Sequence, residues 1–213
     1  MAAPQPLKLY CATSNSGKLR EFRQAAGRDV SIDGLPATDC PETGETFEQN
    51  AVAKALCYSE AALANPATAG ERPLYLFADD SGIEVDALGG APGVHSARFS
   101  GPAATDRSNN ELLLARLAGV AAPERTARFV CSIALTRDGK LWKTFLGKAE
   151  GRILDAPRGP GGFGYDPLFL SPPLSRTFAE LFPEEKLAHS HRGQAFRRML
   201  EWLGAATEGS EPL

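Results

Sequence analysis

The chain has 213 residues, with 23 Lys and Arg against 26 Asp and Glu, and its formal net charge at pH 7 is -3. This length can bury the core of one domain or of two closely packed lobes, and a hydrophobic content of 43% is ordinary for a soluble globular protein. The small negative charge gives no overall electrostatic reason to bind polymeric nucleic acid or anionic membranes, so any phosphate recognition must come from a few placed cations. No apolar run reaches the roughly 20 residues of a membrane span, and residues 1–6 lack the features of a signal peptide. A cytoplasmic protein is therefore expected.

The first half of the chain predicts alternating strands and helices. The expected strands are 7–13, 30–35 and 74–78, and the expected helices are 18–26 and 46–63. The stretch Asn65–Pro73 is rich in Pro, Ala and Gly and predicts a surface loop. The strand 74–78 is expected to end at two aspartates, Asp79 and Asp80.

The second half predicts a helix over 106–117 with Thr105 as its cap, followed by a hairpin. Its strands are expected at 125–136 and 141–153, around the turn Arg137–Lys140. A short strand at 167–170 and a helix over 190–203 follow, and residues 207–213 are expected to fray. Mixed strands and helices predict the α/β class with an antiparallel component.

The four cysteines lie without CxxC spacing, which argues against zinc or redox chemistry. Buried free thiols are the preferred interpretation. This prediction applies to all of them: Cys11, Cys40, Cys57 and Cys131.

The turn Thr13–Lys18 lies between a predicted strand and a predicted helix. Backbone N–H groups and the positive end of the helix dipole favour an anion there, and Lys18 adds a positive charge. The GxxxxGK[ST] spacing of a P-loop is absent. A helix cap with a solvated lysine explains the turn equally well.

Asp79 and Asp80 bring two carboxylates together, which is costly unless a cation or solvent offsets their repulsion. Magnesium commonly uses one or two carboxylates plus substrate phosphates, and Glu42 in the turn Pro41–Gly44 can join them. An Asx-turn or a helix cap is the structural alternative, and it explains one aspartate better than two.

Glycines surround two aromatic residues in the segment Gly159–Pro167. They allow the backbone to approach a flat ligand and leave a ring free to stack on it, although a tight loop whose aromatics fill the core is an equal alternative. Further along, Lys186 and the segment Ser190–Gly193 place basic groups at the start of the last helix, where they oppose its dipole. This arrangement suggests a ligand role. His189 and His191 are unfavourable as a zinc pair because residues two apart do not share a helix face.

The order of these motifs resembles the inosine triphosphate pyrophosphatase family, the XTP/dITP diphosphatases. The matching segments are TSNSGKLREF from Thr13, PETGETFEQNAVAKA from Pro41, FADDSGIEVDALGGAPGVHSARFSG from Phe77, GPGGFGYDPLF from Gly159 and EKLAHSHRGQAF from Glu185. They span nearly the whole chain. The chain departs from the family pattern in the insertion-like loop Asn65–Pro73 and at Leu187, where a polar residue is usual.

The resemblance implies an elongated α/β fold, in which a mixed sheet flanked by helices forms two lobes of one catalytic domain over residues 1–213. The active site is expected in the cleft between the lobes, and the family is usually homodimeric. The implied reaction is Mg²⁺-dependent hydrolysis of ITP, dITP and XTP to the nucleoside monophosphate and pyrophosphate, which cleanses the nucleotide pool.

The resemblance also implies roles for individual residues. The implied triphosphate contacts are Thr13, Ser14, Asn15, Ser16, Gly17, Lys18 and Lys54. Glu42 and Asp80 are the implied magnesium ligands, and Asp80 is also the implied base. The remaining implied substrate contacts are Ser81, Phe163, Gly164, Tyr165, Asp166, Lys186, His191 and Arg192. Of these, Phe163 is expected to stack on the purine, and the last three are expected to contact the base and its surroundings.

Two other functions are compatible with parts of the sequence. A pyrophosphatase for modified pyrimidine or methylated nucleotides would share the phosphate loop and acidic residues, but should lack the FGYD and SHR segments present here. A non-catalytic nucleotide-binding regulator would not need Glu42 and Asp80. Release of pyrophosphate from ITP separates that regulator from an enzyme.

Overall fold

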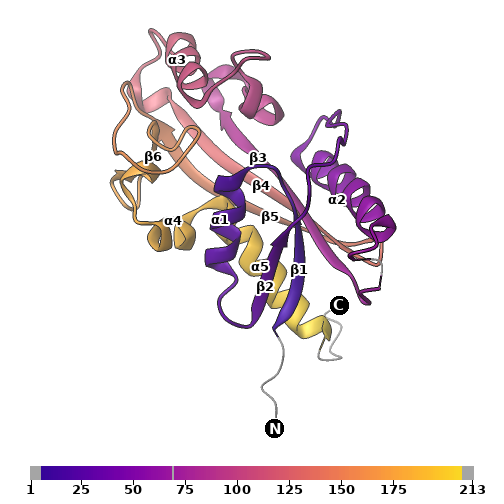
Figure 1. Ribbon diagram of the computed structural model, residues 1–213. Helices are drawn as coiled ribbons and strands as arrows, with labels where there is room; N and C mark the ends of the chain where they lie inside the picture. Colours follow the sequence, from indigo (N-terminus) through magenta and orange to yellow (C-terminus); the bar gives the residue numbers. More distant parts are fainter. Residues whose placement is uncertain (1–5, 69, 208–213) are drawn as a thin grey trace. The chain divides into compact units, whose positions relative to one another are not determined.

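The computed structural model describes residues 6–68 and 70–207 (Figure 1). The N-terminal segment and the end of the expected frayed tail, residues 1–5 and 208–213, lie outside the described residues. The helices are α1 (Ser16–Ala25), α2 (Phe47–Ala64), α3 (Asp106–Arg116), α4 (Pro183–His189) and α5 (His191–Thr207). The strands are β1 (Leu7–Ala12), β2 (Val30–Gly34), β3 (Tyr75–Val85), β4 (Thr126–Arg137), β5 (Lys140–Ile153), β6 (Phe169–Ser171) and β7 (Arg176–Thr177).

The strands form a seven-stranded sheet in the order β2-β1-β3-β4-β5-β6-β7. Strand β1 pairs in parallel with β2 and β3, whereas β6 pairs antiparallel with β5 and β7. The predicted α/β class with a mixed sheet and flanking helices is confirmed.

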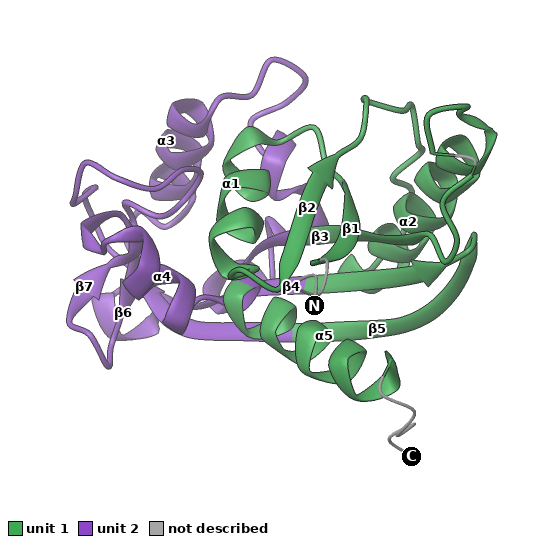
Figure 2. Ribbon diagram, turned by 60° about the horizontal axis from the view of Figure 1, so that its bottom comes forward, with its two compact units in different colours: residues 1–80, 132–146, 193–213 green, residues 81–131, 147–192 purple. Residues whose placement is uncertain are grey.

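The chain divides into two compact units, which Figure 2 shows in different colours. Unit 1 comprises residues 1–80, 132–146 and 193–213, and unit 2 comprises residues 81–131 and 147–192. Strands β3, β4 and β5 each contribute residues to both units.

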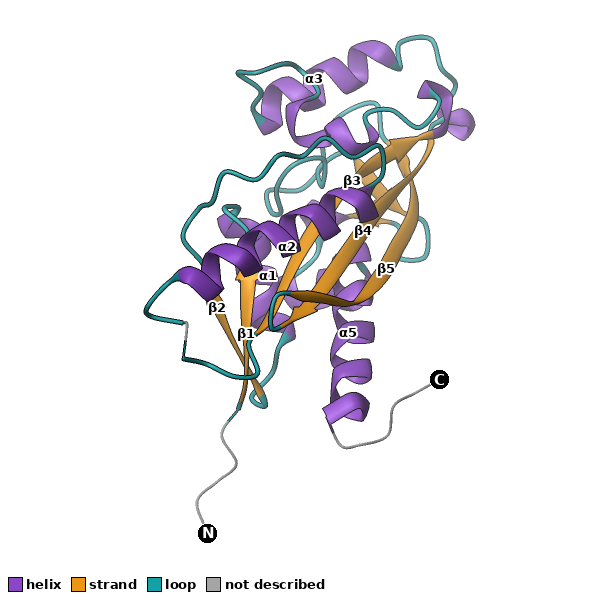
Figure 3. Ribbon diagram, turned by 90° about the vertical axis from the view of Figure 1, so that its right-hand side faces the viewer, coloured by secondary structure: helices purple, strands orange, loops and turns teal. Residues whose placement is uncertain are grey.

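In unit 1 the alternation of β3 separates two apolar layers. Leu76 and Ala78 pack with the small buried residues of α2, among them Ala51 and Ala55, so this helix approaches the strands closely. Phe77 points to the other face, where its ring contacts Phe22 of α1 and Phe196 of α5 at centroid distances of 5.0 and 5.5 Å. Helix α2 and the pair α1 and α5 therefore cover opposite faces of the strands in this unit (Figure 3).

Unit 2 has its own aromatic core. The ring of Phe129 on β4 lies 4.6 Å from that of Phe169 and 5.8 Å from that of Phe178. Leu113 and Leu117, from α3 and the residue after it, are fully buried in the same cluster. These contacts fix α3 and the loops around it on the strands of unit 2.

Two local predictions are confirmed in detail. Thr105 caps α3, because its side chain accepts a hydrogen bond from the Ser108 N–H. The hairpin turn consists of Asp138 and Gly139, whose φ angles of 51° and 81° are those of a two-residue turn of the Asp-Gly type.

The expected end of β3 at the two aspartates is wrong, because the strand continues through them to Val85. Its apolar pattern resumes at Ile83 and Val85, both fully buried, and each carboxylate has a polar partner, Lys18 for Asp79 and Asn50 for Asp80. Helix α4 was not predicted from the sequence, although Pro183 at its start is a typical first helical residue.

The prediction of four free thiols is wrong for two of the cysteines. Cys40 and Cys57 form a disulfide between the loop before α2 and that helix, whereas Cys11 and Cys131 are free and buried. Sequence spacing gives no signal for this pair, because folding brings together two residues separated by 17 positions.

Candidate active site

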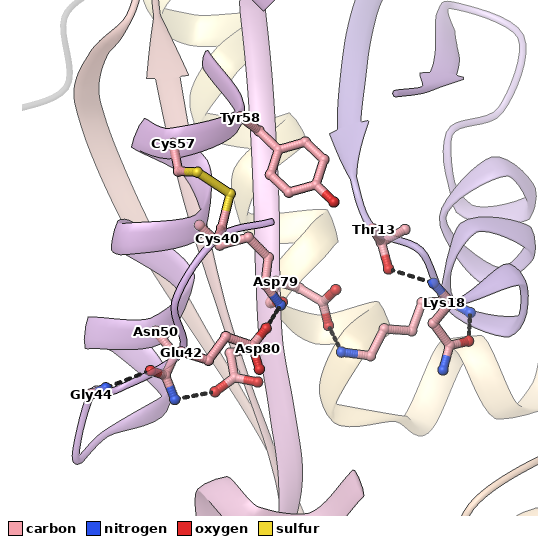
Figure 4. A network of polar contacts seen from close by, with 12 residues as sticks. Thr13, Lys18, Cys40, Glu42, Gly44, Asn50, Cys57, Tyr58, Asp79 and Asp80 are labelled. Atoms are coloured by element: carbon pink, nitrogen blue, oxygen red, sulfur yellow. Dashed lines mark hydrogen bonds and ion pairs between the residues drawn. A yellow bond between two sulfur atoms is a disulfide. The ribbon is translucent and has the colours of Figure 1, made fainter. Parts of the chain in front are cut away.

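The two aspartates of β3 point to opposite faces of the strand, as successive residues of a strand must. Asp79 lies on the face of α1, where its Oδ2 is 2.8 Å from Nζ of Lys18 and its side chain is fully buried. Asp80 lies on the face of α2, where its Oδ2 accepts a 3.0 Å hydrogen bond from the Asn50 amide (Figure 4). The strand thus places adjacent carboxylates in different surroundings.

The loop between β1 and α1 is both a helix cap and an anion-compatible turn. Asn15 caps α1 by accepting a 3.0 Å hydrogen bond from the Lys18 N–H, and its own N–H donates to Oγ1 of Thr13 at 3.2 Å. The cap interpretation is therefore correct for Asn15. Contact with a triphosphate stays a prediction for the loop residues Thr13, Ser14 and Asn15 and for the first residues of α1, which are Ser16, Gly17 and Lys18.

Lys54 of α2 connects the turn before that helix to β3. Its Nζ forms an ion pair with Glu42 and donates a 3.4 Å hydrogen bond to the Asp79 carbonyl. Burial alone would lower the pKa of Lys54, but the Asp79 charge and the bond to Glu42 raise it overall. Lys54 is therefore held in its charged form beside the carboxylates.

Glu42 and Asp80 are the residues of unit 1 that suit a hard divalent cation. Burial raises the pKa of Asp80, against the opposing effects of Lys18 and the Asn50 hydrogen bond, so this desolvated carboxylate gains from a nearby cation. The described residues contain no group of three or more His, Cys, Asp or Glu that can hold a metal. Two carboxylate donors fit magnesium nonetheless, since that ion commonly takes one or two carboxylates and completes its shell with water and phosphate.

A second polar group lies in unit 2, around Asp166 of the glycine-rich loop. Its Oδ2 lies 2.5 Å from Nζ of Lys186 and accepts a 2.9 Å hydrogen bond from the Phe163 N–H. Both members of the ion pair are buried. Nζ of Lys186 also lies 4.6 Å from the centre of the Phe163 ring, and the guanidinium of Arg192 lies 5.5 Å from it. The loop, α4 and the start of α5 therefore bring Phe163, Asp166, Lys186 and Arg192 together.

Arg192 and His191, adjacent at the start of α5, have different surroundings. Nη2 of Arg192 donates a 2.8 Å hydrogen bond to Oγ of Ser81, which joins two of the predicted substrate contacts. The His191 ring is buried and stacks on Phe129, with centroids 4.7 Å apart and planes 8° from parallel. His189 is the last residue of α4, so the two histidines belong to different helices.

The middle of the glycine-rich loop is anchored to α3 and to the 3₁₀ helix Gly93–Arg98. The Gly164 N–H donates to Asp106 at 2.7 Å, and the Gly164 carbonyl accepts from Asn110 at 2.9 Å. The buried Tyr165 donates its hydroxyl to the Ser96 carbonyl at 2.8 Å. The interpretation that an aromatic of this loop fills the core is therefore correct for Tyr165, and substrate contact by Gly164 and Tyr165 stays a prediction.

Comparison with known protein families assigns the chain that carries these residues to a family. The model of the Ham1 family matches residues 9–202, which include all the groups described above. The chain belongs to the Ham1 family.

Ham1 relatives with curated names support the same conclusion. The chain is 48% identical over 198 residues to the dITP/XTP pyrophosphatase of Exiguobacterium sibiricum, covering 91% of this chain and 95% of that protein. It is 46% identical to the protein of the same name from Geobacter sulfurreducens, covering 92% of this chain and 96% of that one. The Ham1 protein of Staphylococcus aureus has a solved structure that aligns with a TM-score of 0.78 at 37% identity, over 93% of this chain and 99% of that chain.

Within this Ham1 chain, sequence reasoning missed the residues that support the predicted contacts. Asn50 holds Asp80, and Asp106 and Asn110 hold Gly164. The sequence contains one signal for Asn50, which is an amide in an alanine-rich helix. If such a helix packs against a sheet, a buried amide requires hydrogen-bond partners. The α3 residues gave no such signal, since their partner lies more than fifty positions away in the chain.

Proposed function

We propose that this chain is a magnesium-dependent pyrophosphatase, which converts ITP, dITP and XTP to the nucleoside monophosphate and pyrophosphate. The observation that carries the proposal is the run of charged contacts in unit 1. Glu42 contacts Lys54, Lys54 contacts the carbonyl of Asp79, and the Asp79 carboxylate contacts Lys18. Two cations and the carboxylates thus gather beside a helix N-terminus. The names of the curated relatives support the same activity for this chain.

The residues of unit 1 account for the charge of the substrate. A triphosphate carries roughly four negative charges, and Lys18, Lys54 and the N–H groups at the start of α1 offset part of them. Glu42 and Asp80 would hold Mg²⁺, which when bound would neutralise phosphate charge and polarise the phosphoryl oxygens.

In the proposed reaction a water oxygen forms a bond to the α-phosphorus, and the bond from that phosphorus to the α–β bridging oxygen breaks. Asp80 accepts the proton of the attacking water. The electron pair of the broken bond leaves with pyrophosphate, so no covalent intermediate is required. Asp79 is paired with Lys18 on the other face of β3, which leaves Asp80 as the carboxylate for this role.

The polar group in unit 2 supports selection of a 6-oxo purine. Hypoxanthine and xanthine carry an acceptor at C6, where adenine has a donor amine. Donors from Arg192 and His191 would pair with the first kind and leave the second unsatisfied, which costs binding free energy. Phe163 would provide the stacking face, and Lys186 with Asp166 would fix its loop.

The test measures products as well as rates. The protein is incubated with ITP, dITP, XTP, ATP and a methylated pyrimidine triphosphate at the same Mg²⁺ concentration, and pyrophosphate is separated from orthophosphate. In water enriched in ¹⁸O, the label is expected in the monophosphate, because attack is at the α-phosphorus. Orthophosphate as the direct product, preference for the pyrimidine, or binding without turnover would each contradict the proposal.

Asp80→Asn provides the matching variant, because the amide keeps the size of the side chain and removes its charge. Turnover of ITP should be abolished while the urea unfolding curve stays close to that of the wild type. Substantial activity of the folded variant at saturating magnesium would show that Asp80 is not required for the reaction.

We also propose that the chain acts as a homodimer in the cytoplasm, as the family resemblance implies. No helix among the described residues is long and apolar enough to cross a membrane. Light scattering on the purified protein tests the first point, since a dimer has twice the monomer mass of 22.7 kDa. Cell fractionation tests the second. The disulfide makes the second test informative, because disulfides are rare in reducing cytosol.

A further inference from the structure

Asn50 is the fourth residue of α2 and has only 1% of its surface exposed. A buried amide in a helix otherwise rich in alanine is costly unless both of its ends are hydrogen-bonded. Here both ends are used. Its Nδ2 donates to Oδ2 of Asp80 at 3.0 Å, and its Oδ1 accepts from the Gly44 N–H at 2.8 Å.

The two partners of Asn50 belong to the two segments that carry the proposed metal ligands. Asp80 is one ligand itself, and Gly44 ends the turn that contains the other, Glu42. A carboxamide offers a donor to a carboxylate at one end and an acceptor to a backbone N–H at the other. A carboxylate at position 50 would repel Asp80, and an aliphatic side chain would leave both partners without this bond.

The contact with Gly44 is too close for any other residue. A Cβ built on Gly44 would lie 2.7 Å from Cβ of Gln49 and 2.8 Å from Oδ1 of Asn50. The next residue is held on the same helix turn, since the Glu45 N–H donates to the Gln49 side chain at 2.8 Å. The turn bearing Glu42 is therefore fixed against the start of α2, with the Asn50 amide at its centre (Figure 4).

We propose that Asn50 is a positioning residue, whose amide holds the Glu42 turn and Asp80 in one fixed arrangement and thereby sets the affinity for the divalent cation. This inference rests on the proposed function, because it assumes that Glu42 and Asp80 bind the metal. Groups that orient metal ligands typically contribute 10- to 100-fold to metal affinity or activity.

Asn109 of α3 supplies a matched control. It is also buried and uses both ends of its amide, accepting from the Ser100 N–H at 2.8 Å and donating to the Ala97 carbonyl at 3.2 Å. Its other partners are the Ser100 hydroxyl, which donates to Oδ1 at 2.9 Å, and the Ser96 carbonyl, so none of its partners is a carboxylate. Asn50→Leu and Asn109→Leu therefore both remove a buried amide that is bonded at both ends, at similar side-chain volume. Asn109→Leu loses more hydrogen bonds, but only Asn50→Leu affects the proposed metal ligands.

The primary measurement is binding of Mn²⁺ alone, followed by the electron paramagnetic resonance signal of the free ion, without nucleotide. Asn50→Leu should weaken Mn²⁺ binding about 10- to 100-fold relative to the wild type. Asn109→Leu should bind Mn²⁺ as the wild type does, even if urea unfolds it earlier. With ITP, the Asn50 variant should need more Mg²⁺ for half-maximal kcat and should recover activity at high Mg²⁺.

Gly44→Ala is the second variant, which keeps the test decisive if Asn50→Leu does not fold. It moves the turn and leaves the bond from Asn50 to Asp80 available, so a smaller loss of Mn²⁺ affinity is expected. Unchanged Mn²⁺ affinity in the Asn50 variant, or in Gly44→Ala when the Asn50 variant does not fold, overturns the inference. An equal loss in Asn109→Leu, or no Mn²⁺ binding by the wild type, also overturns it. Failure of the wild type to release pyrophosphate from ITP would instead contradict the proposed function.

Discussion

Opening the Cys40–Cys57 disulfide should destabilise the protein measurably. The bond closes a segment with a sequence separation of 17, which contains the turn with Glu42 and the start of α2. Crosslinking a loop of this size lowers the entropy of the unfolded chain, and the chain-entropy relation gives about 3 kcal/mol at 25 °C. This is a large part of the roughly 5–15 kcal/mol by which proteins of this kind are stable.

The assay is urea unfolding of the wild type and of Cys57→Ser, each with and without a phosphine reductant. With a denaturant slope of about 2–3 kcal/mol per molar urea, the wild-type midpoint should fall by about 1–1.5 M when the reductant is added. The Cys57→Ser midpoint should already be low and should not respond to the reductant. Thiol titration in denaturant should find two free thiols in the oxidised wild type, since Cys11 and Cys131 are free.

Two results would refute this reasoning. If the unreduced wild type, purified without reductant, has four titratable thiols, the disulfide does not form in solution. If it has two and the urea midpoint still does not move on reduction, the native turn before α2 is held by its other contacts and the crosslink restricts the unfolded chain very little.

Three further predictions concern the substrate. Lys18→Ala should raise KM for ITP, because a cation that faces the phosphates is lost. It should also lower the urea midpoint, because buried Asp79 loses this partner. Normal ITP binding by the variant would indicate that the segment serves only as a helix cap. Phe163→Ala should weaken binding of the purine nucleotide roughly tenfold or more and should weaken pyrophosphate binding less. If calorimetry finds the same loss of affinity for both ligands, the loop has collapsed. Arg192→Ala should lower kcat/KM for ITP about tenfold or more relative to ATP, because hydrogen bonds to charged groups contribute roughly 1.5–3 kcal/mol. An unchanged ITP/ATP ratio would indicate a structural role for Arg192, through contacts such as its bond to Ser81.

The features that sequence predicts well are those decided by neighbouring residues. The Thr105 cap and the Asp138-Gly139 turn depend on side chains within three positions, so composition and order suffice. The extent of β3 was misjudged because charged residues normally end a buried strand. Asp79 is tolerated inside β3 through Lys18, a residue sixty-one positions earlier, and no local pattern contains that information.

In the candidate site, too, sequence motifs indicate the residues within a segment but not the contacts between distant segments. The motifs identified Lys18, Glu42 and Asp80 as residues suited to phosphate and metal, and the structure brings them to the start of α1, the turn before α2 and β3. The residues that orient them were not identified, because their contacts join distant segments. For Tyr165 the sequence left two interpretations open, and the buried ring with its hydroxyl bonded to the Ser96 carbonyl shows that the residue has a structural role, while its substrate contact stays a prediction.

The position of the two aspartates inside a strand, rather than after it, has a chemical consequence. In a flexible loop both carboxylates could turn toward one cation, which would then offset their mutual repulsion. In β3 the pleat directs Asp79 to Lys18 on one face and Asp80 to Asn50 on the other. A charged partner compensates the first carboxylate, and a neutral amide orients the second without cancelling its charge. The strand therefore leaves the charge of Asp80 available for the proposed metal and base roles, while Asp79 keeps Lys18, in the first turn of α1, in place.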